Sequence, residues 1–197
     1  MRTDKLYLVG FMGAGKSTVA RALGRRLDWR VEDVDALIEA RERATISEIF
    51  AARGEAYFRA AEREVLRQLL TPRHLVVATG GGTFADPDSR ALINADGASI
   101  WLDVPIERAL DRLPADGSRP LAADREGFEG LYRLRRVAYQ QAHVRIDASR
   151  APVEELVERI LDWLGYSWTV DSGQWTVDHA DPPTDRRRPL ATDPCAT

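Results

Sequence analysis

The sequence predicts an α/β fold built on a parallel sheet, because short apolar runs alternate with longer amphipathic stretches. The clearest case is the run KLYLVG at 5–10, a buried-strand pattern that is followed by a glycine-rich turn and an amphipathic stretch. The chain has 197 residues, of which 44% are hydrophobic, and this is enough for one domain with a substantial core. We therefore expect one compact α/β domain over 1–164.

The expected elements alternate in order along this domain. Pro105 favours a helix that starts there, because proline is accepted in the first turn of a helix. The polar, glycine- and proline-containing segment 114–125 is expected to be a loop. Strands are expected at 5–10, 29–33, 74–79, 98–103 and 144–148, and helices at 17–27, 35–43, 46–53, 55–70, 87–94, 105–113, 127–143 and 152–164.

The composition changes after residue 164, and we expect a separate C-terminal extension over 165–197. It holds four of the ten prolines and the basic triplet 186–188. The tetrapeptide WTVD occurs at 168–171 and again at 175–178, and these two alternating runs favour a short hairpin. From residue 179 onward we expect disorder. The extension is assigned no function.

Composition and charge exclude several classes of protein. The 28 basic and 31 acidic residues give a net charge of −3, which provides no general attraction to nucleic acids or anionic membranes. The single cysteine, Cys195, can form neither an internal disulfide nor a zinc site. The apolar run 6–12 covers about a third of a membrane span and lacks a signal-peptide cleavage region. We expect a cytoplasmic protein.

The segment 10–17 (GFMGAGKS) fits the phosphate-loop pattern G-x-x-x-x-G-K-[ST]. Its glycines let successive backbone N–H groups point inward at an anion, and the following helix directs its positive end to the same point. Lys16 is one of only two lysines in the chain and suits a transferring phosphoryl group. Ser17 offers an oxygen to magnesium. The pattern predicts binding of nucleotide phosphates.

Two carboxylates follow the second expected strand. Asp33 and Asp35 are two residues apart, so on a strand they would share a face at the carboxyl edge of the sheet, where open α/β sheets bind ligands. One could hold magnesium through water while the other accepts a proton from a substrate hydroxyl. Asp35 could instead cap the helix that starts at Ala36. Both interpretations remain open from the spacing.

A triple glycine and several arginines are further candidates. The glycines at 80–82 allow a ligand to approach the backbone closely, or they form only a tight turn. Arg59 follows Glu55 by four residues, which favours a surface ion pair. Arg119 lies in the loop that is long enough to act as a lid. Taken singly, each arginine in the chain is better explained as a solvated surface charge.

Taken in order, these pieces resemble the shikimate kinases over about residues 4–164. The resemblance implies a three-layer P-loop kinase fold with a five-stranded parallel sheet flanked by helices, a substrate-binding region at about 33–62 and a lid at about 114–125. It also implies transfer of the ATP γ-phosphoryl group to the 3-hydroxyl of shikimate, with ATP and Mg²⁺ as cofactors. We expect the protein to be a monomer. The matching segments are GFMGAGKST (10–18), VEDVDALIE (31–39), ISEIFAARGEAYFRAAE (46–62), ATGGG (78–82), GSRPLA (117–122) and RRVAY (135–139).

The resemblance also implies roles for individual residues. Asp35 would act as the base, and Lys16 and Arg119 would complete the catalytic group, with Arg119 coming from the lid. Ser17 and Asp33 would lie at the metal, while Glu62 would orient Arg59. Nucleotide contacts would come from Gly13, Ala14, Gly15, Lys16, Ser17, Thr18, Arg112 and Arg119, and shikimate contacts from Asp33, Asp35, Arg59, Gly80, Gly81, Gly82 and Arg135.

The chain departs from the family pattern at three places, one of which is the tryptophan-containing tail, which has no counterpart in the family. Two alternative functions also remain. The segment RRVAY leaves Arg135 or Arg136 as the substrate contact, with the spacing to Tyr139 favouring Arg135. Thr83 and Phe84 follow the triple glycine, where a small residue and valine are more usual. One alternative is a kinase resembling gluconate kinase, but the histidine pattern of that family is absent. The other is a non-catalytic nucleotide-binding module.

Overall fold

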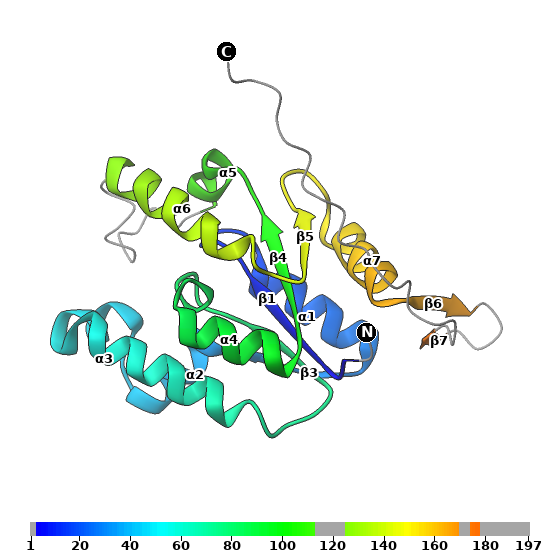
Figure 1. The fold of residues 1–197 in the computed structure, drawn as a ribbon, viewed down its shortest axis with the longest axis horizontal. Coiled ribbons are helices and arrows are strands. Elements are labelled where there is room, and N and C mark those ends of the chain that lie inside the picture. Colours follow the sequence, from blue (N-terminus) through cyan, green and yellow to red (C-terminus); the bar gives the residue numbers. More distant parts are fainter. Residues whose placement is uncertain (1–2, 113–124, 170–173, 178–197) are drawn as a thin grey trace, which may run out of the picture.

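The computed structural model describes residues 3–112, 125–169 and 174–177 and contains a five-stranded parallel sheet flanked by helices (Figure 1). The strand order is β2-β3-β1-β4-β5, and every neighbouring pair is parallel, which confirms the predicted fold class. The strands are β1 (Lys5–Val9), β2 (Arg30–Asp33), β3 (Leu75–Ala78), β4 (Ala98–Asp103) and β5 (Val144–Asp147). The helices are α1 (Lys16–Leu27), α2 (Val34–Glu42), α3 (Ile46–Gln68), α4 (Pro87–Asp96), α5 (Ile106–Asp111), α6 (Arg125–Tyr139) and α7 (Val153–Leu164).

Helices cover both faces of the sheet, so the fold has three layers. Helices α1 and α7 pack against each other on one face, whereas α4 and α6 lie on the other (Figure 1). Every residue of β1, β3 and β4 is buried, as expected for the central strands of a parallel sheet. Because the strands are parallel, the loops that follow β1, β2 and β3 meet at one edge. This edge holds the candidate site.

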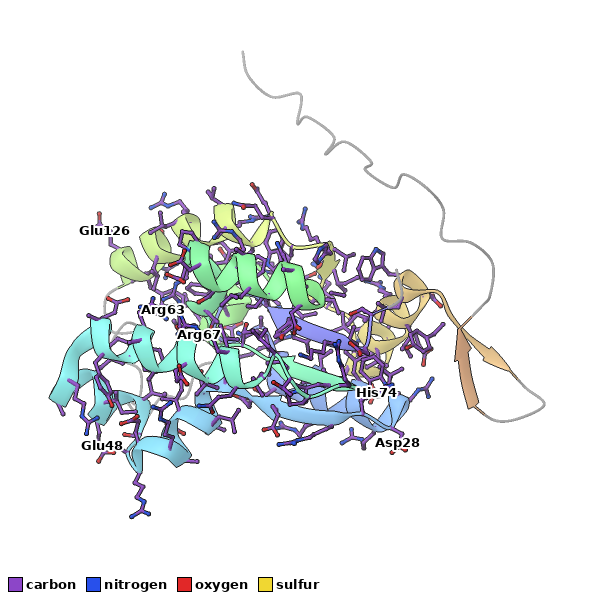
Figure 2. All side chains as sticks on the ribbon, turned by 60° about the horizontal axis from the view of Figure 1, so that its bottom comes forward. Asp28, Glu48, Arg63, Arg67, His74 and Glu126 are labelled. Atoms are coloured by element: carbon purple, nitrogen blue, oxygen red, sulfur yellow. The ribbon has the colours of Figure 1, made fainter. Side chains whose placement is uncertain are left out.

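Two chain reversals at the opposite edge use left-handed backbone at residues other than glycine. Asp28 (φ 55°) precedes β2 and His74 (φ 53°) precedes β3, and they lie near each other in Figure 2. The amide of Arg30 donates to the His74 carbonyl at 3.1 Å, and the ring of Trp29 contacts that of His74. These contacts tie the starts of β2 and β3 together.

Several helix bounds differ from the sequence-based prediction, whereas the predicted break at residue 54 agrees with it. Helix α6 ends at Tyr139 rather than at residue 143, because the chain turns there. The amide of His143, directly before β5, then donates to the hydroxyl of Ser99 on β4. Pro105 is the N-cap of α5 and not part of its first turn. Gly54 (φ 76°, ψ 174°) interrupts α3 at the point where the sequence predicts one helix to end and another to begin.

The predictions for the C-terminal extension and the lid fall partly on described residues and partly outside them. Strands β6 (Tyr166–Thr169) and β7 (Gln174–Val177) pair in an antiparallel manner, with Trp168 opposite Trp175, where the sequence predicts a hairpin. Residues 113–124, which include Arg119 and nearly all of the expected lid, are not described, nor is the chain from 178 onward. Within the described ranges, no helix is both long enough and apolar enough to cross a membrane.

Lys5, the other lysine of the chain besides Lys16, lies fully buried at the amino end of β1. Its Nζ donates to the carbonyl of Leu69 at 2.7 Å and to that of Leu70, both at the end of α3, and pairs with Asp96 at 2.8 Å. The Tyr7 hydroxyl donates to the same carboxylate, and burial together with Asp96 raises the pKa of Tyr7 above its usual range. This cluster ties α3 and α4 to the central strand.

We predict that Lys5→Met destabilises the protein by about 3 kcal/mol, because it removes the cation that pairs with a largely buried carboxylate and the donor to two carbonyls at the end of α3. Urea unfolding followed by circular dichroism measures the loss. Arg73→Ala is the matched control, since it removes an exposed pair with Asp4 and should cost less than about 1 kcal/mol. Equal losses in the two variants would contradict the structural role of Lys5.

Candidate active site

The phosphate loop connects β1 to α1 and lies at the carboxyl edge of the sheet. Gly13 (φ 76°) and Gly15 (φ 87°) take left-handed backbone that favours glycine. A Cβ on Gly13 would lie 2.6 Å from the Ala109 carbonyl oxygen, so the loop packs directly on α5. Lys16 Nζ donates to the carbonyls of Gly10 and Phe11 at 2.9 Å each, which holds the ammonium group over the loop.

Ser17, in the first turn of α1, meets Asp33 at the end of β2. The Ser17 hydroxyl donates to Asp33 Oδ2 at 2.6 Å. A hydroxyl oxygen and a carboxylate oxygen side by side at a phosphate loop match the hard oxygen donors that Mg²⁺ takes, usually together with water and phosphate oxygens. The two residues present therefore fit the metal that the sequence predicts here.

Asp33, and not Asp35, is the residue that caps α2. Its Oδ1 accepts from the amides of Asp35 at 3.1 Å and Ala36 at 3.4 Å, so the helix begins at Val34. The alternative interpretation of Asp35 as the cap is wrong. The strand-face argument is also wrong, because Asp35 lies in the first turn of a helix rather than on β2. The turn of the helix nevertheless brings its side chain to the phosphate loop.

A small polar cavity of about 140 Å³ joins these groups. Thr79, at the end of β3, and Met12 also line it, and sequence reasoning missed both as site residues. The position of Thr79 directly before the triple glycine is the signal that could have identified it. The complete lining comprises Met12, Gly13, Gly15, Lys16, Ser17, Thr18, Asp33, Asp35, Thr79 and Gly81.

The triple glycine after β3 makes room for charged side chains. A Cβ on Gly80 would lie 2.7 Å from Asp35 Oδ1 and 2.8 Å from Glu62 Oε1. A Cβ on Gly82 would lie 2.5 Å from both terminal nitrogens of Arg59. Real Cβ contacts of this length do not occur, so any larger residue would displace these groups. The turn is therefore a close-approach site for one guanidinium and two carboxylate groups.

Arg59 has a buried partner in addition to the surface partner that its spacing indicates. Its Nη1 donates to Glu62 Oε2 at 2.7 Å, and Nε and Nη2 donate to Glu55 Oε1 at 3.3 and 3.2 Å. Glu55 is exposed, whereas the Glu62 side chain is only 1% exposed. Burial of Arg59 opposes its charge, but the carboxylates of Glu62 and Glu55 together outweigh this effect, so the pKa of Arg59 is raised.

Arg135 lies on α6 and faces the same turn. The residue is only 8% exposed, and a Cβ on Gly81 would lie 3.3 Å from its Nη1. Burial lowers the pKa of Arg135, and the charge of Arg59 lowers it further. In the part of the chain that the structure describes, no carboxylate forms an ion pair with it; its guanidinium lies 5.8 Å from the centre of the Phe11 ring. The Tyr139 hydroxyl donates to the Gly81 carbonyl and anchors α6 here.

Arg136 lies outside this arrangement. Its Nη2 pairs with Asp103 at 3.2 Å, and the same carboxylate pairs with Arg145 at 2.7 Å. The guanidinium lies over the ring of Trp101, and the side chain is 41% exposed. Of the two arginines that the sequence left open, the structure therefore brings Arg135 to the triple glycine. Phe84, the other departure, is fully buried in the hydrophobic core and does not line the cavity.

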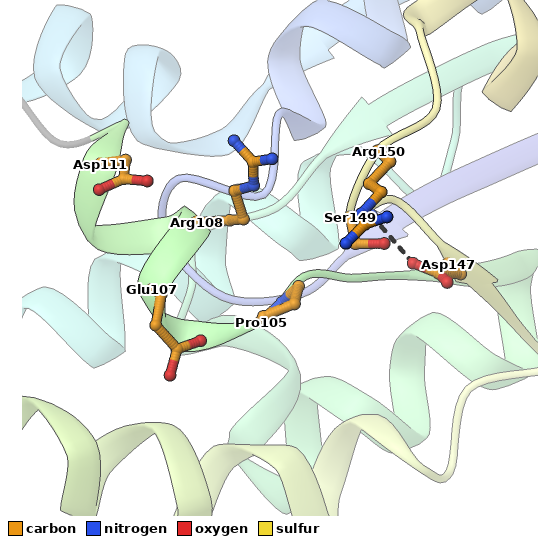
Figure 3. Close-up of a pocket in the computed structure, with 7 residues that line it drawn as sticks. All are labelled: Pro105, Glu107, Arg108, Asp111, Asp147, Ser149 and Arg150. Carbon is orange, nitrogen blue, oxygen red and sulfur yellow. Dashed lines mark hydrogen bonds between the residues drawn. The ribbon is translucent and has the colours of Figure 1, made fainter.

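A larger cavity of about 580 Å³ lies between α5 and the loop after β5 (Figure 3). Arg112, at the end of α5, donates from Nη1 to the Gly13 carbonyl at 3.3 Å, which ties this helix to the phosphate loop. The residues that line this larger cavity are mostly charged and do not include those of the phosphate loop. The lining residues are Pro105, Glu107, Arg108, Asp111, Asp147, Ser149 and Arg150.

The chain is similar in sequence and structure to known kinases. The family model for shikimate kinase matches residues 12–165. The shikimate kinase of Sulfurihydrogenibium sp. is 41% identical over 157 residues, covering 79% of this chain and 95% of that protein. The structure of the shikimate kinase from Acinetobacter baumannii in complex with shikimate aligns with a TM-score of 0.76 at 36% identity, over 81% of this chain and 92% of that one. The Aquifex aeolicus enzyme aligns with a TM-score of 0.73 at 37% identity, over 80% and 94% of the two chains. The chain belongs to the shikimate kinase family.

Proposed function

We propose that this protein transfers the γ-phosphoryl group of ATP to the 3-hydroxyl of shikimate, giving shikimate 3-phosphate and ADP. The observation that carries the proposal is the pair of guanidinium groups of Arg59 and Arg135 at the triple-glycine turn, beside the carboxylate of Asp35 and the phosphate loop. Family membership and the similarity to an enzyme whose structure holds shikimate support it.

The charges on the acceptor side favour a small anion. Glu62 balances Arg59, but no carboxylate within the described residues pairs with Arg135, which is costly for a buried cation. A substrate carboxylate would supply the missing negative charge, and a guanidinium group binds a carboxylate through parallel hydrogen bonds. The carboxylate of shikimate would therefore lie between Arg59 and Arg135.

The transfer would take place between Asp35 and the phosphate loop. Asp35 accepts the proton of the acceptor hydroxyl while the hydroxyl oxygen of the acceptor attacks the γ-phosphorus. The new P–O bond forms as the bond between the γ-phosphorus and the β-phosphate oxygen breaks, and ADP leaves. Lys16 exchanges its bonds to the loop carbonyls for bonds to phosphate oxygens. Ser17 and Asp33 would hold Mg²⁺, which neutralises phosphate charge when bound. Arg119 would add charge from the lid, as the family resemblance implies.

The nucleoside part of ATP would lie along α5. The cavity of about 580 Å³ borders this helix, and Arg112 connects the end of the helix to the phosphate loop at Gly13.

We also propose that the protein works as a monomer in the cytoplasm, without nucleic-acid or membrane partners. Lys16, Asp35 and the two guanidinium groups all come from one chain, so the site needs no second copy.

The acceptor assay tests the proposed function directly. With Mg²⁺ and ATP, the purified protein should release ADP rapidly when shikimate is present, and far more slowly with quinate, gluconate or no acceptor. A coupled ADP-release assay measures all four rates. Activity on gluconate alone, or ATP turnover that does not depend on the acceptor, would refute the proposal.

Asp35→Asn tests the catalytic base. The variant should lower kcat by about 10²- to 10⁴-fold, because a positioned base contributes this much to proton transfer. ADP affinity and the free energy of unfolding should stay near those of the parent, since Asp33 provides the cap of α2. Calorimetric titration with ADP and urea unfolding check these controls. A comparable loss of ADP affinity would show that Asp35 serves the nucleotide site and not the acceptor.

The neighbours Arg135 and Arg136 form a matched pair of variants. Arg135→Met should raise the KM for shikimate by about tenfold or more, as expected for the loss of a charge-assisted hydrogen bond, and leave the KM for ATP almost unchanged. Arg136→Met removes an equal charge one residue away and should leave both KM values close to the parent values. Steady-state kinetics with each substrate varied in turn decides the matter, and the reverse pattern would assign the acceptor contact to Arg136.

A further inference from the structure

Thr83 lies directly after the triple glycine, at the start of the short 3₁₀ turn η1 (Thr83–Ala85). The residue is fully buried, and its hydroxyl donates a hydrogen bond to Glu62 Oε1 on α3. Its own amide donates to the Gly80 carbonyl at 3.2 Å, so the backbone that carries the hydroxyl is held by the glycine turn. A threonine at this point is one of the departures of this chain from the family pattern.

The two oxygens of Glu62 have separate partners. Oε1 accepts from Thr83 and approaches the backbone of Gly80, where only the absence of a Cβ leaves room for it. Oε2 accepts from Arg59 Nη1 at 2.7 Å. The side chain is 1% exposed, so water does not compete for either oxygen. A carboxylate held at one oxygen cannot rotate freely and presents its other oxygen in a fixed direction.

Arg59 depends on this fixed oxygen for its own position. Its guanidinium lies against Gly82, in the space that a side chain would otherwise fill. The remaining partner, Glu55, has a side chain that is 67% exposed, and an exposed pair of this kind holds a flexible arginine only weakly. The buried contact with Glu62 is therefore the one that sets the direction of the guanidinium.

We propose that Thr83 is a positioning residue for the acceptor: its hydroxyl locks Glu62, and Glu62 in turn holds Arg59 in the orientation that receives the acceptor's carboxylate. The proposal rests on the proposed function, in which Arg59 binds that carboxylate. Threonine suits this task because its β-branch restricts χ1 and keeps the hydroxyl directed at one partner, whereas serine rotates more easily. Thr83 itself does not touch the substrate.

Thr83→Val is the direct test, because valine keeps the shape of the side chain and removes the hydroxyl. The KM for shikimate should rise about tenfold, as expected for a hydrogen bond to a charged group, while kcat at saturating shikimate and the Kd for ADP stay within about twofold of the parent. Thr83→Ser restores the donor and should recover most of the lost affinity. Should valine prevent folding, Thr83→Ala removes the same donor and provides the same comparison.

A double-mutant cycle distinguishes this inference from the proposed function. In the Arg59→Ala background, Thr83→Val should cause no further rise in the KM for shikimate, because Thr83 acts through Arg59. An unchanged KM in Thr83→Val, or independent multiplication of the two effects, would overturn the positioning role. If Arg59→Ala alone left the KM for shikimate unchanged, the assignment of Arg59 in the proposed function would fail instead. Arg67→Ala, on the exposed surface of the same helix, is the control arginine variant and should alter neither KM.

Discussion

The site depends on the close approach that three consecutive glycines allow at the end of β3. Side chains from α2 and α3 reach the backbone of this turn, where a single Cβ at Gly80 or Gly82 would displace a carboxylate or a guanidinium group. Helix α6 reaches it from a third direction through Tyr139 and Arg135. The phosphate loop lies next to it because β1 and β3 are neighbours in a parallel sheet. The topology thus brings the groups that bind phosphate and those that suit a carboxylate to one turn.

The balance of charge within this turn determines what it can bind. Arg59 and Asp35 approach the turn from different helices. Glu62 also lies close to it, and one of its carboxylate oxygens accepts from Thr83 while the other accepts from Arg59. Arg135 adds a further buried positive charge whose pKa is lowered by burial and by Arg59. In the proposed function, an anion bound at this turn would balance the buried positive charge and would lie close to the Asp35 carboxylate. Under the proposed function, these charges would select a small acid that carries a hydroxyl group.

The sequence predicted the sheet, nearly every helix and the phosphate loop, because these depend on local periodicity and on a motif with a fixed strand–turn–helix context. It placed the Asp35 side chain at this edge of the sheet, but for the wrong reason, since a side-chain cap at Asp33 starts α2 earlier than the spacing suggests. The buried contacts of Lys5 and Thr83 could not be predicted, because both residues bond to partners far away in the sequence, such as Asp96 for Lys5. The same limit applies to the arginines, because only tertiary packing distinguishes the buried Arg135 from the partly exposed Arg136.

A crystal structure with ADP and shikimate bound together tests the central claim most directly. The account predicts that the carboxylate of shikimate lies within hydrogen-bonding distance of both Arg59 and Arg135, with the reacting hydroxyl directed at Asp35 and the ADP phosphates in the loop at 10–17. Shikimate bound away from the triple glycine, or with its carboxylate turned from both arginines, would contradict the account.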